Sequence, residues 1–388
     1  MKITVPDKKR FFVIFIFALF ILSPTQVPRP GFGQEKSSAA ITEQTEGITN
    51  SQTKAIKQTV ESADCPNNQF LRIPGNPECR QDKKIVLVSG DEEYRSEEML
   101  TQLAWILSVW HGFDTVVLYA INPETGMIDP LTLTNIPGLE ELRTADMMIF
   151  FTRFRNLPDS QMKEIDDYLR SGRPIIGIRT ATHAFNIPDS STYARYSFNY
   201  KSGDTNAYPT WNDGFGHKVL GETWIDHHGI HKTESTRGIL TDAGKRSPIL
   251  QGCSDLYGPT DVYRVRLPLQ GDAVPLVLGQ VLSGMAPNDP PVENEKNNPM
   301  MPIVWLKSYA LENGTPGQAL TSTLGCGQDF LCEDYRRLLV NATYVLTGLT
   351  DLVPQKANVR LIGDYEPREM GFGNVVPNQT PAKMSPRL

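Results

Sequence analysis

The sequence Pro174-Ile-Ile-Gly-Ile-Arg-Thr-Ala-Thr-His-Ala-Phe185 predicts a short buried strand that runs directly into a polar loop. The apolar run is followed by Arg179, Thr180, Thr182 and His183. Central strands of parallel sheets have this pattern, and they deliver polar side chains to a crevice at their carboxyl ends. We therefore expect the polar residues of this loop to line the main functional site.

Histidines are concentrated in the segment that follows this strand. Five of the six histidines fall between positions 183 and 231. Three of them occur in Trp224-Ile-Asp-His-His-Gly-Ile-His231. The charge of a histidine changes near neutral pH, so such a cluster is typical of acid/base catalysis or of metal binding. The spacing matches no common zinc motif such as H-E-x-x-H.

The segments before the strand predict a parallel α/β sheet. Apolar runs with the length of buried strands lie at 84–89, 115–119, 147–152 and 174–178. Helical periodicity follows the first and third runs, at 96–110 and 160–170. This alternation favours a doubly wound, mainly parallel sheet with helices on both faces. The first, third and fourth runs should be neighbours, with Asp91, Arg153 and Arg179 near one sheet edge.

The second half of the chain has a less regular pattern. Residues 186–225 are rich in Ser, Tyr, Asn, Asp and Gly, which predicts a long polar insertion near the site. Further elements are expected as strands at 261–267, 273–278 and 303–309 and as a helix at 330–346. The folded domain is expected to span 83–352, and residues 353–388 are expected to form an irregular C-terminal tail.

The N-terminus has the pattern of a secretory signal peptide. A basic segment ending at Arg10 precedes twelve apolar residues, 11–22, which are too few to span a bilayer as a helix. We expect residues 1–33 to be removed, which predicts a periplasmic or secreted protein with no stable membrane span. An uncleaved anchor is the alternative. Residues 34–82 are polar with few large apolar side chains, which predicts a flexible linker.

The mature chain is expected to be acidic. Residues 1–33 carry five basic side chains and one acidic side chain, so removing this net +4 changes the formal charge from −6 to −10. An acidic protein without a basic stripe is a poor partner for the phosphates of nucleic acids. We therefore expect no binding of nucleic acid.

The five cysteines are compatible with disulfides in an exported protein. Cys65 and Cys79 bracket a segment rich in Pro, Asn and Gly. A bridge between them would close a loop of roughly 15 residues and stabilise the fold by about 3 kcal/mol. Cys326 and Cys332 are a second candidate pair, and Cys253 is expected to be free. No C-x-x-C spacing occurs, so a structural zinc site is not favoured.

Several motifs resemble the ThuA-like (trehalose-utilisation) family. They are Gly177-Ile-Arg-Thr-Ala-Thr-His-Ala-Phe185, Gly221-Glu-Thr-Trp-Ile-Asp-His-His-Gly229, Tyr257-Gly-Pro-Thr-Asp-Val-Tyr263 and Asp334-Tyr-Arg-Arg-Leu-Leu-Val-Asn-Ala342. Two more, Gly90-Asp-Glu-Glu-Tyr-Arg-Ser-Glu97 and Arg153-Phe-Arg-Asn-Leu-Pro158, resemble an exported branch typical of planctomycete-like bacteria. The resemblance implies the flavodoxin-like fold of the class I glutamine-amidotransferase superfamily. It also implies a role in sugar or oxidised-sugar metabolism.

The resemblance places an arginine where amidotransferases of this superfamily carry their nucleophilic cysteine. The corresponding strand-to-helix turn here is Gly177-Ile-Arg-Thr-Ala181. A guanidinium stays protonated and cannot be a nucleophile, so amidotransferase chemistry is excluded. Arg179 instead either holds substrate oxygens or bridges buried carboxylates such as Asp91 or Glu93. A second departure is Gly325-Cys326, because many relatives have Gly-His there.

These residues predict an acid/base site for a carbohydrate or keto-sugar. His183 is expected to transfer protons, and His228 is expected to orient or assist it. The residues expected to bind the substrate or to shape its pocket are Asp91, Tyr94, Arg179, Thr180, Thr182, Trp224, His227 and Asp261. No cofactor is predicted.

Other functions stay open. His183, His228 and a carboxylate from Asp226 or Asp261 could hold the divalent metal of a hydrolase. Asp226 and Asp261 could also act as the paired carboxylates of a glycosidase. A sugar-binding module of a periplasmic assembly would need no catalysis. Trp224 and Trp211 could stack on a sugar ring.

Overall fold

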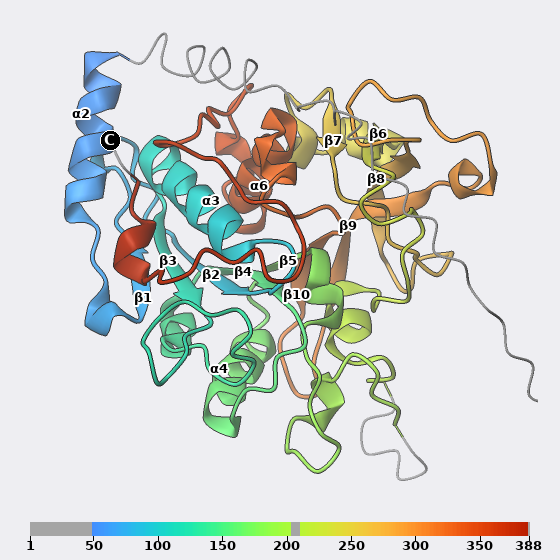
Figure 1. Cartoon of the computed structure of the whole chain (residues 1–388), viewed down its shortest axis with the longest axis horizontal. Helices are drawn as coiled ribbons and strands as arrows, with labels where there is room; N and C mark the ends of the chain where they lie inside the picture. Colours follow the sequence, from blue (N-terminus) through green and yellow to red (C-terminus); the bar gives the residue numbers. More distant parts are fainter. Residues whose placement is uncertain (1–48, 203–209, 387–388) are drawn as a thin grey trace, which may run out of the picture. The chain divides into compact units, whose positions relative to one another are not determined.

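The fold is organised around one mixed sheet of ten strands. The computed structural model describes residues 49–202 and 210–386 (Figure 1). The strands are β1 Phe70–Ile73, β2 Lys84–Gly90, β3 Asp114–Tyr119, β4 Met147–Thr152, β5 Ile175–Ile178, β6 Thr236–Leu240, β7 Leu256–Gly258, β8 Val274–Val281, β9 Met301–Tyr309 and β10 Gly317–Ser322. Their order in the sheet is β1-β3-β2-β4-β5-β10-β9-β8-β6-β7.

One part of the sheet is parallel and the other is antiparallel. β3, β2, β4, β5 and β10 run parallel to one another, so the predicted neighbours β2, β4 and β5 are confirmed. β9, β8, β6 and β7 continue the sheet through antiparallel pairs, and β1 pairs antiparallel with β3. The prediction of a mainly parallel sheet is therefore wrong for this second part. Its strands are joined by loops, short 3-10 turns and the five-residue α5 (Asp242–Arg246), whereas parallel crossovers usually contain a longer helix that packs on the sheet.

Helices cover both faces of the sheet. α3 (Ser96–His111) and α6 (Glu333–Leu346) pack on one face, and α4 (Asp159–Arg170) packs on the other. The helices predicted from the periodicity at 96–110 and 160–170 are thus confirmed. Strands buried on both faces need apolar side chains at successive positions, which explains their continuous apolar runs.

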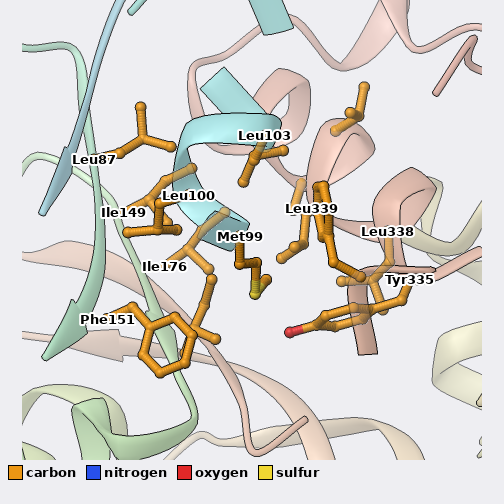
Figure 2. Packing of buried hydrophobic residues seen from close by; sticks show 14 of the residues in the cluster. Leu87, Met99, Leu100, Leu103, Ile149, Phe151, Ile176, Tyr335, Leu338 and Leu339 are labelled. Carbon is orange, nitrogen blue, oxygen red and sulfur yellow. The ribbon is translucent and has the colours of Figure 1, made fainter. Parts of the chain in front are cut away.

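The core under α3 and α6 holds the central strands side by side. Figure 2 shows Leu87, Ile149 and Ile176 from three neighbouring strands beside Leu100 of α3 and Leu339 of α6. All five side chains are fully buried. Burying such a side chain contributes about 1.5–3 kcal/mol. This layer fixes β2, β4 and β5, and with them the sheet edge where their polar loops begin.

The N-terminal segment is more ordered than its sequence suggested. The expected flexible linker, 34–82, is described from residue 49 on, and there it forms α2 (Asn50–Ser62) and β1. Leu71 and Ile73 are buried because β1 pairs with β3 at the sheet edge. The expected signal peptide, 1–33, lies outside the described residues. No described helix has both the length and the apolar character needed to cross a bilayer.

The predicted Cys65–Cys79 bridge is not formed. All five cysteines are free thiols, including the second candidate pair, Cys326 and Cys332. The Cys79 thiol instead donates to the carbonyl of Trp110 at 3.7 Å. Burial raises the pKa of both Cys65 and Cys79, which keeps these thiols protonated. Pairing of β1 with β3, rather than a disulfide, holds the intervening segment in place.

The strand predicted at 261–267 is also absent. This segment makes a single bridge, between Tyr263 and His227, because it follows the histidine-containing loop instead of a neighbouring strand. The strands predicted at 273–278 and 303–309 are confirmed as β8 and β9.

The segment after α6 has little regular structure but lies along α3. Trp110 Nε1 donates to the carbonyl of Arg360 at 2.8 Å, and Trp105 Nε1 donates to that of Met384 at 3.3 Å. Figure 1 shows this segment in red, running across α3. Residues 353–386 therefore form a strap that is held by hydrogen bonds to a core helix.

A buried histidine at this strap predicts a pH-dependent stability. His111 Nε2 donates to the carbonyl of Asn358 at 2.8 Å, and Nδ1 lies 3.2 Å from the Tyr344 hydroxyl. Burial lowers the pKa of His111 from 6.5 to about 4, although the bond to Asn358 opposes this shift. The unfolded chain therefore binds more protons than the folded one between these two values. The stabilisation is complete above pH 6.5 and is lost as the pH falls toward 4.

The free energy of unfolding should accordingly fall by up to about 3 kcal/mol between neutral pH and pH 4 from this residue alone. Urea titrations of the wild type and of His111→Gln would measure it. The variant should lose most of this contribution to the pH dependence. Identical pH dependence in the two proteins would contradict the assignment.

Candidate functional site

The candidate site lies where β2, β4 and β5 end. The loops that leave these strands are 91–95, 153–155 and 179–183. They meet at one sheet edge, where Arg153 N–H donates to the carbonyl of Gly90 at 2.9 Å. The loop that carries the histidines is joined to the segment around Tyr263 by the bridge between Tyr263 and His227. Doubly wound sheets bind their ligands in the crevice at this edge.

Arg179 is the central buried side chain of this group. Its Nη1 donates to the backbone carbonyls of Asp261 at 2.6 Å and Thr323 at 2.8 Å. Its Nη2 donates to Asp261 Oδ1 at 2.8 Å and to the hydroxyl of Tyr94 at 3.2 Å. The guanidinium carbon also lies 3.6 Å from the centroid of the Tyr263 ring. These contacts join the loop after β5, the residue after β10 and the segment that carries Asp261.

The surroundings of Arg179 favour a positioning role for it. Its side chain is 0% exposed, and its carboxylate partner is Asp261 rather than Asp91 or Glu93. Its φ of 47° is left-handed, at the turn from β5 into the 3-10 helix η4 (Arg179–His183). Such a conformation costs roughly 1–3 kcal/mol for a residue other than glycine. Both terminal nitrogens are committed to fixed partners, which compensates for this strain.

Asp91 and Thr180 form a second buried link. The Thr180 hydroxyl donates to Asp91 Oδ2 at 2.6 Å. Asp91 Oδ1 accepts from the backbone N–H of Glu93 at 2.8 Å and from that of Tyr94. Both Asp91 and Thr180 are fully buried. This link ties the turn after β2 to the turn after β5 and sets the position of Glu93.

Two histidines share the carboxylate of Asp261. His227 Nδ1 donates to Oδ2 at 2.7 Å, and His231 Nδ1 donates to Oδ1 at 3.1 Å. With Nδ1 as the donor, each neutral ring keeps a lone pair on Nε2 that can act as a base. His231 Nε2 lies 3.5 Å from Glu93 Oε1. The His227 and His231 side chains are 34% and 26% exposed, whereas the Asp261 side chain is 0% exposed. Two solvent-facing imidazoles are therefore hydrogen-bonded to one buried carboxylate.

The two carboxylates of this group have opposite pKa shifts. Burial raises the pKa of Asp261, but the charge of Arg179 and the two imidazole hydrogen bonds outweigh it and hold the pKa well below its usual range. Burial and the charge of Asp91 raise the pKa of Glu93, and nearby cations offset this only in part. Asp261 is therefore a fixed negative charge, while Glu93 is the carboxyl group better suited to carry a proton.

His183 is buried beside this group. Its ring centroid lies 5.1 Å from that of Phe154 and 5.2 Å from that of Trp224. The Thr182 hydroxyl donates to the carbonyl of Arg179 at 3.1 Å, so His183 Nδ1 donates to Thr182 Oγ1 at 3.2 Å. Burial, followed by the nearby cations, lowers the pKa of His183 well below 6.5. His183 is therefore neutral at physiological pH, with Nε2 as an acceptor.

His228 takes a different direction from its neighbour His227. Its Nε2 donates to the carbonyl of Lys296 at 2.8 Å, and its Nδ1 is buried without a hydrogen-bond partner among the described residues. Within that part of the chain, no ring contact joins His228 to His183. His227, and not His228, bonds the Asp261 carboxylate of this group.

Four residues of this group were not among the predicted site residues. They are Glu93, Arg153, His231 and Tyr263. His231 belongs to the histidine cluster, and Glu93 belongs to the acidic run after β2, so each carried a signal. The ring of Trp224, one of the predicted residues, contacts the rings of both His183 and His227.

His227, His231 and Asp261 also form a group that could hold a metal ion. One nitrogen from each imidazole and one carboxylate oxygen lie within 4.8 Å of one another. Two imidazoles and a carboxylate suit Zn²⁺ and similar ions. This set shares Asp261 with the predicted one but has His227 and His231 in place of His183 and His228. The alternative carboxylate, Asp226, pairs with Arg264 at 2.7 Å, and both of these side chains are half exposed.

Three hollows on the described residues lie away from this group. Their volumes are about 630, 560 and 420 Å³, and none of them is lined by His227, His231 or Asp261. The candidate site is therefore identified by its chemistry and not by cavity size.

Comparison with known proteins gives structural matches at low sequence identity. No family model and no curated protein matches this sequence. A protein of Bacteroides uniformis described as thua-like matches with a TM-score of 0.40 and 14% identity, over 69% of this chain and 92% of that one. A protein of Parabacteroides merdae, also described as thua-like, matches with a TM-score of 0.39 and 12% identity, over 69% of this chain and 91% of that one. The N-terminal domain of mmIFT52 matches with a TM-score of 0.32 and 14% identity, over 69% of this chain and 97% of that one.

The buried contacts of Arg179 predict a large effect on stability. Arg179→Met removes the guanidinium that pairs with the buried Asp261 carboxylate, which should lower the free energy of unfolding by about 3–5 kcal/mol. Arg264→Met is the matched control, because its ion pair with Asp226 is half exposed and should contribute less than about 1 kcal/mol. Urea unfolding of both variants would measure the difference. Equal effects would show that Arg179 does not hold the site together.

Proposed function

We propose that this protein is an exported ThuA-like protein of the planctomycete type that acts on a carbohydrate or keto-sugar by histidine-assisted acid/base chemistry. The sequence motifs support the family, and the N-terminal pattern supports export to the periplasm or beyond. The strand order β3-β2-β4-β5-β10 supports a flavodoxin-like, doubly wound fold. The observation that carries the proposal is the pair of solvent-facing imidazoles on the buried, ionised Asp261.

The proposed reaction is removal of a proton next to a sugar carbonyl. The Nε2 lone pair of His231 takes the proton as the C–H bond breaks, and the electron pair of that bond moves to the carbonyl oxygen. Asp261 stabilises the resulting imidazolium through its bond to Nδ1. Protonated His227 can donate Nε2–H to the enolate oxygen. Glu93, 3.5 Å from His231 Nε2, can receive the proton or return it.

The two histidines named from the sequence have supporting roles in this proposal. His183 is neutral and buried, and it offers an Nε2 acceptor behind Trp224. His228 holds its loop through the carbonyl of Lys296. Three fully buried residues position the reacting groups without contacting the substrate: Asp91, Arg179 and Thr180.

A substitution at His231 tests this function. His231→Gln should lower kcat by about 100- to 10,000-fold, because general acid/base catalysis contributes that much. The thermal midpoint should change little, since the side chain is partly exposed. The assay incubates the mature protein with a panel of keto-sugars and follows the products by mass spectrometry. His217→Gln is the control, because His217 lies in η6 (Gly216–Leu220) and, among the described residues, its Nδ1 donates to the carbonyl of the nearby Asn212.

Two results would change this assignment. Equal activity in the His231 and His217 variants would show that His231 does not transfer the proton. Sugar binding by the wild type without turnover would identify a non-catalytic sugar-binding module.

A metal-dependent hydrolase is the second candidate, and the group of two imidazoles and one carboxylate favours it. His227, His231 and Asp261 would hold the ion, which would supply a water of lowered pKa. An Nδ1 that ligates a metal cannot also donate to Asp261, so the two candidates exclude each other at these nitrogens. Arg179 already neutralises much of the Asp261 charge, which favours the acid/base reading.

Metal content separates the two candidates. We expect no stoichiometric divalent metal in protein purified without chelators, and we expect turnover to persist in EDTA. Elemental analysis of the wild type and of His231→Gln would measure this. One metal per chain that disappears in the variant would establish the hydrolase candidate instead.

A further inference from the structure

The C-terminal strap brings an exposed aromatic ring to the mouth of the site. Gly371 N–H donates to the carbonyl of Glu93 at 2.7 Å, which fixes the strap against the loop after β2. Beside it, the centroid of the Phe372 ring lies 5.1 Å from the guanidinium carbon of Arg153. The same carbon lies 4.5 Å from the Phe154 ring. A residue of the segment after α6 therefore stands beside the end of β4.

The backbone presents Phe372 to solvent. This residue is 61% exposed, whereas Met370 is 3% exposed and anchors the strap. Gly371 and Gly373 flank it with φ values of 136° and 80°, which side chains rarely allow. A single exposed apolar residue is ordinary on a protein surface. This one is held by a guanidinium that also pairs with the carboxylates of the site, so its position is tied to the site.

The aromatic rings form a path from the surface toward His183. Arg153 contacts both Phe372 and Phe154, and Phe154 in turn contacts His183, whose ring contacts that of Trp224. Aromatic faces bind the apolar C–H faces of sugar rings, and guanidinium groups donate to hydroxyl oxygens. The path therefore contains both an aromatic face and a guanidinium group, the two kinds of group that can bind a pyranose ring.

We propose that Phe372 and Arg153 form a subsite for a second sugar ring, next to the ring that reacts at His231; this proposal rests on the function proposed above. The exposed face of Phe372 stacks on a pyranose, and Arg153 donates to hydroxyl groups at its edge. Glu92 and Glu93 hold Arg153 in place for that contact. The substrate class is then a disaccharide or a glycoside rather than a free monosaccharide.

The test compares disaccharide and monosaccharide substrates of the same reacting sugar. Phe372→Ala should raise KM or Kd for the disaccharide by about 3- to 10-fold, with kcat and the thermal midpoint nearly unchanged. The constants for the monosaccharide should not change, and Phe372→Trp should restore the disaccharide constant. Leu352→Ala is the control, because Leu352 is 55% exposed and lies in η10 (Thr350–Leu352). Steady-state kinetics and calorimetry on the full mature chain provide these values.

Each other outcome overturns the subsite. An unchanged disaccharide constant in Phe372→Ala, with binding retained in the wild type, overturns it and leaves the proposed function standing. Equal weakening for both substrates, or a lowered thermal midpoint, assigns Phe372 a structural role. Failure of the wild type itself to bind any sugar of the panel overturns the proposed function together with the subsite.

Discussion

The ion pair between Arg179 and Asp261 is the interaction on which the site depends. Both side chains are 0% exposed, so the pair is desolvated on both sides. Such pairs gain little over apolar packing, but breaking one leaves a buried charge uncompensated. Here the guanidinium also bonds two backbone carbonyls, which lysine could not do with the same planar geometry. The pair thus fixes the carboxylate that orients His227 and His231.

The balance of charges around this pair explains why Glu93 differs from Glu92. Glu92 pairs with both Arg153 and Arg155, so its two oxygens have close cationic partners. Glu93 has longer contacts, 3.7 Å to Arg153 Nε and 3.5 Å to His231 Nε2. Burial, followed by the like charge of Asp91, raises the pKa of Glu93, and the same two causes raise the pKa of Glu92. Glu93 therefore differs from Glu92 in its longer cationic contacts and in its place beside a solvent-facing imidazole.

The sequence predicted those features of the structure that depend on the local pattern of apolar and polar residues. Continuous apolar runs located β2, β4 and β5, and the polar residues that follow them placed Asp91 and Thr180 at one sheet edge. It could not distinguish His227 from His228, because adjacent side chains in an irregular loop take directions set by tertiary partners. Those partners are the Asp261 carboxylate for one and a carbonyl of a distant loop for the other. Strands β7 and β10 were missed for a related reason, since neither contains a continuous apolar run and pairing with neighbours defines them.

The parallel and antiparallel parts of the sheet support different residues of the site. The parallel part provides the turns after β2, β4 and β5, which carry Asp91, Arg153 and Arg179. The antiparallel part supports the segment that carries Asp261, because Thr236 of β6 donates to the carbonyl of Thr260 at 2.6 Å. Asp329, fully buried, accepts from Thr260 and from the N–H of Gly325, and so joins that segment to the loop after β10. A carboxylate held by the antiparallel part thus meets a guanidinium held by the parallel part, which is why a wholly parallel sheet would not build this group.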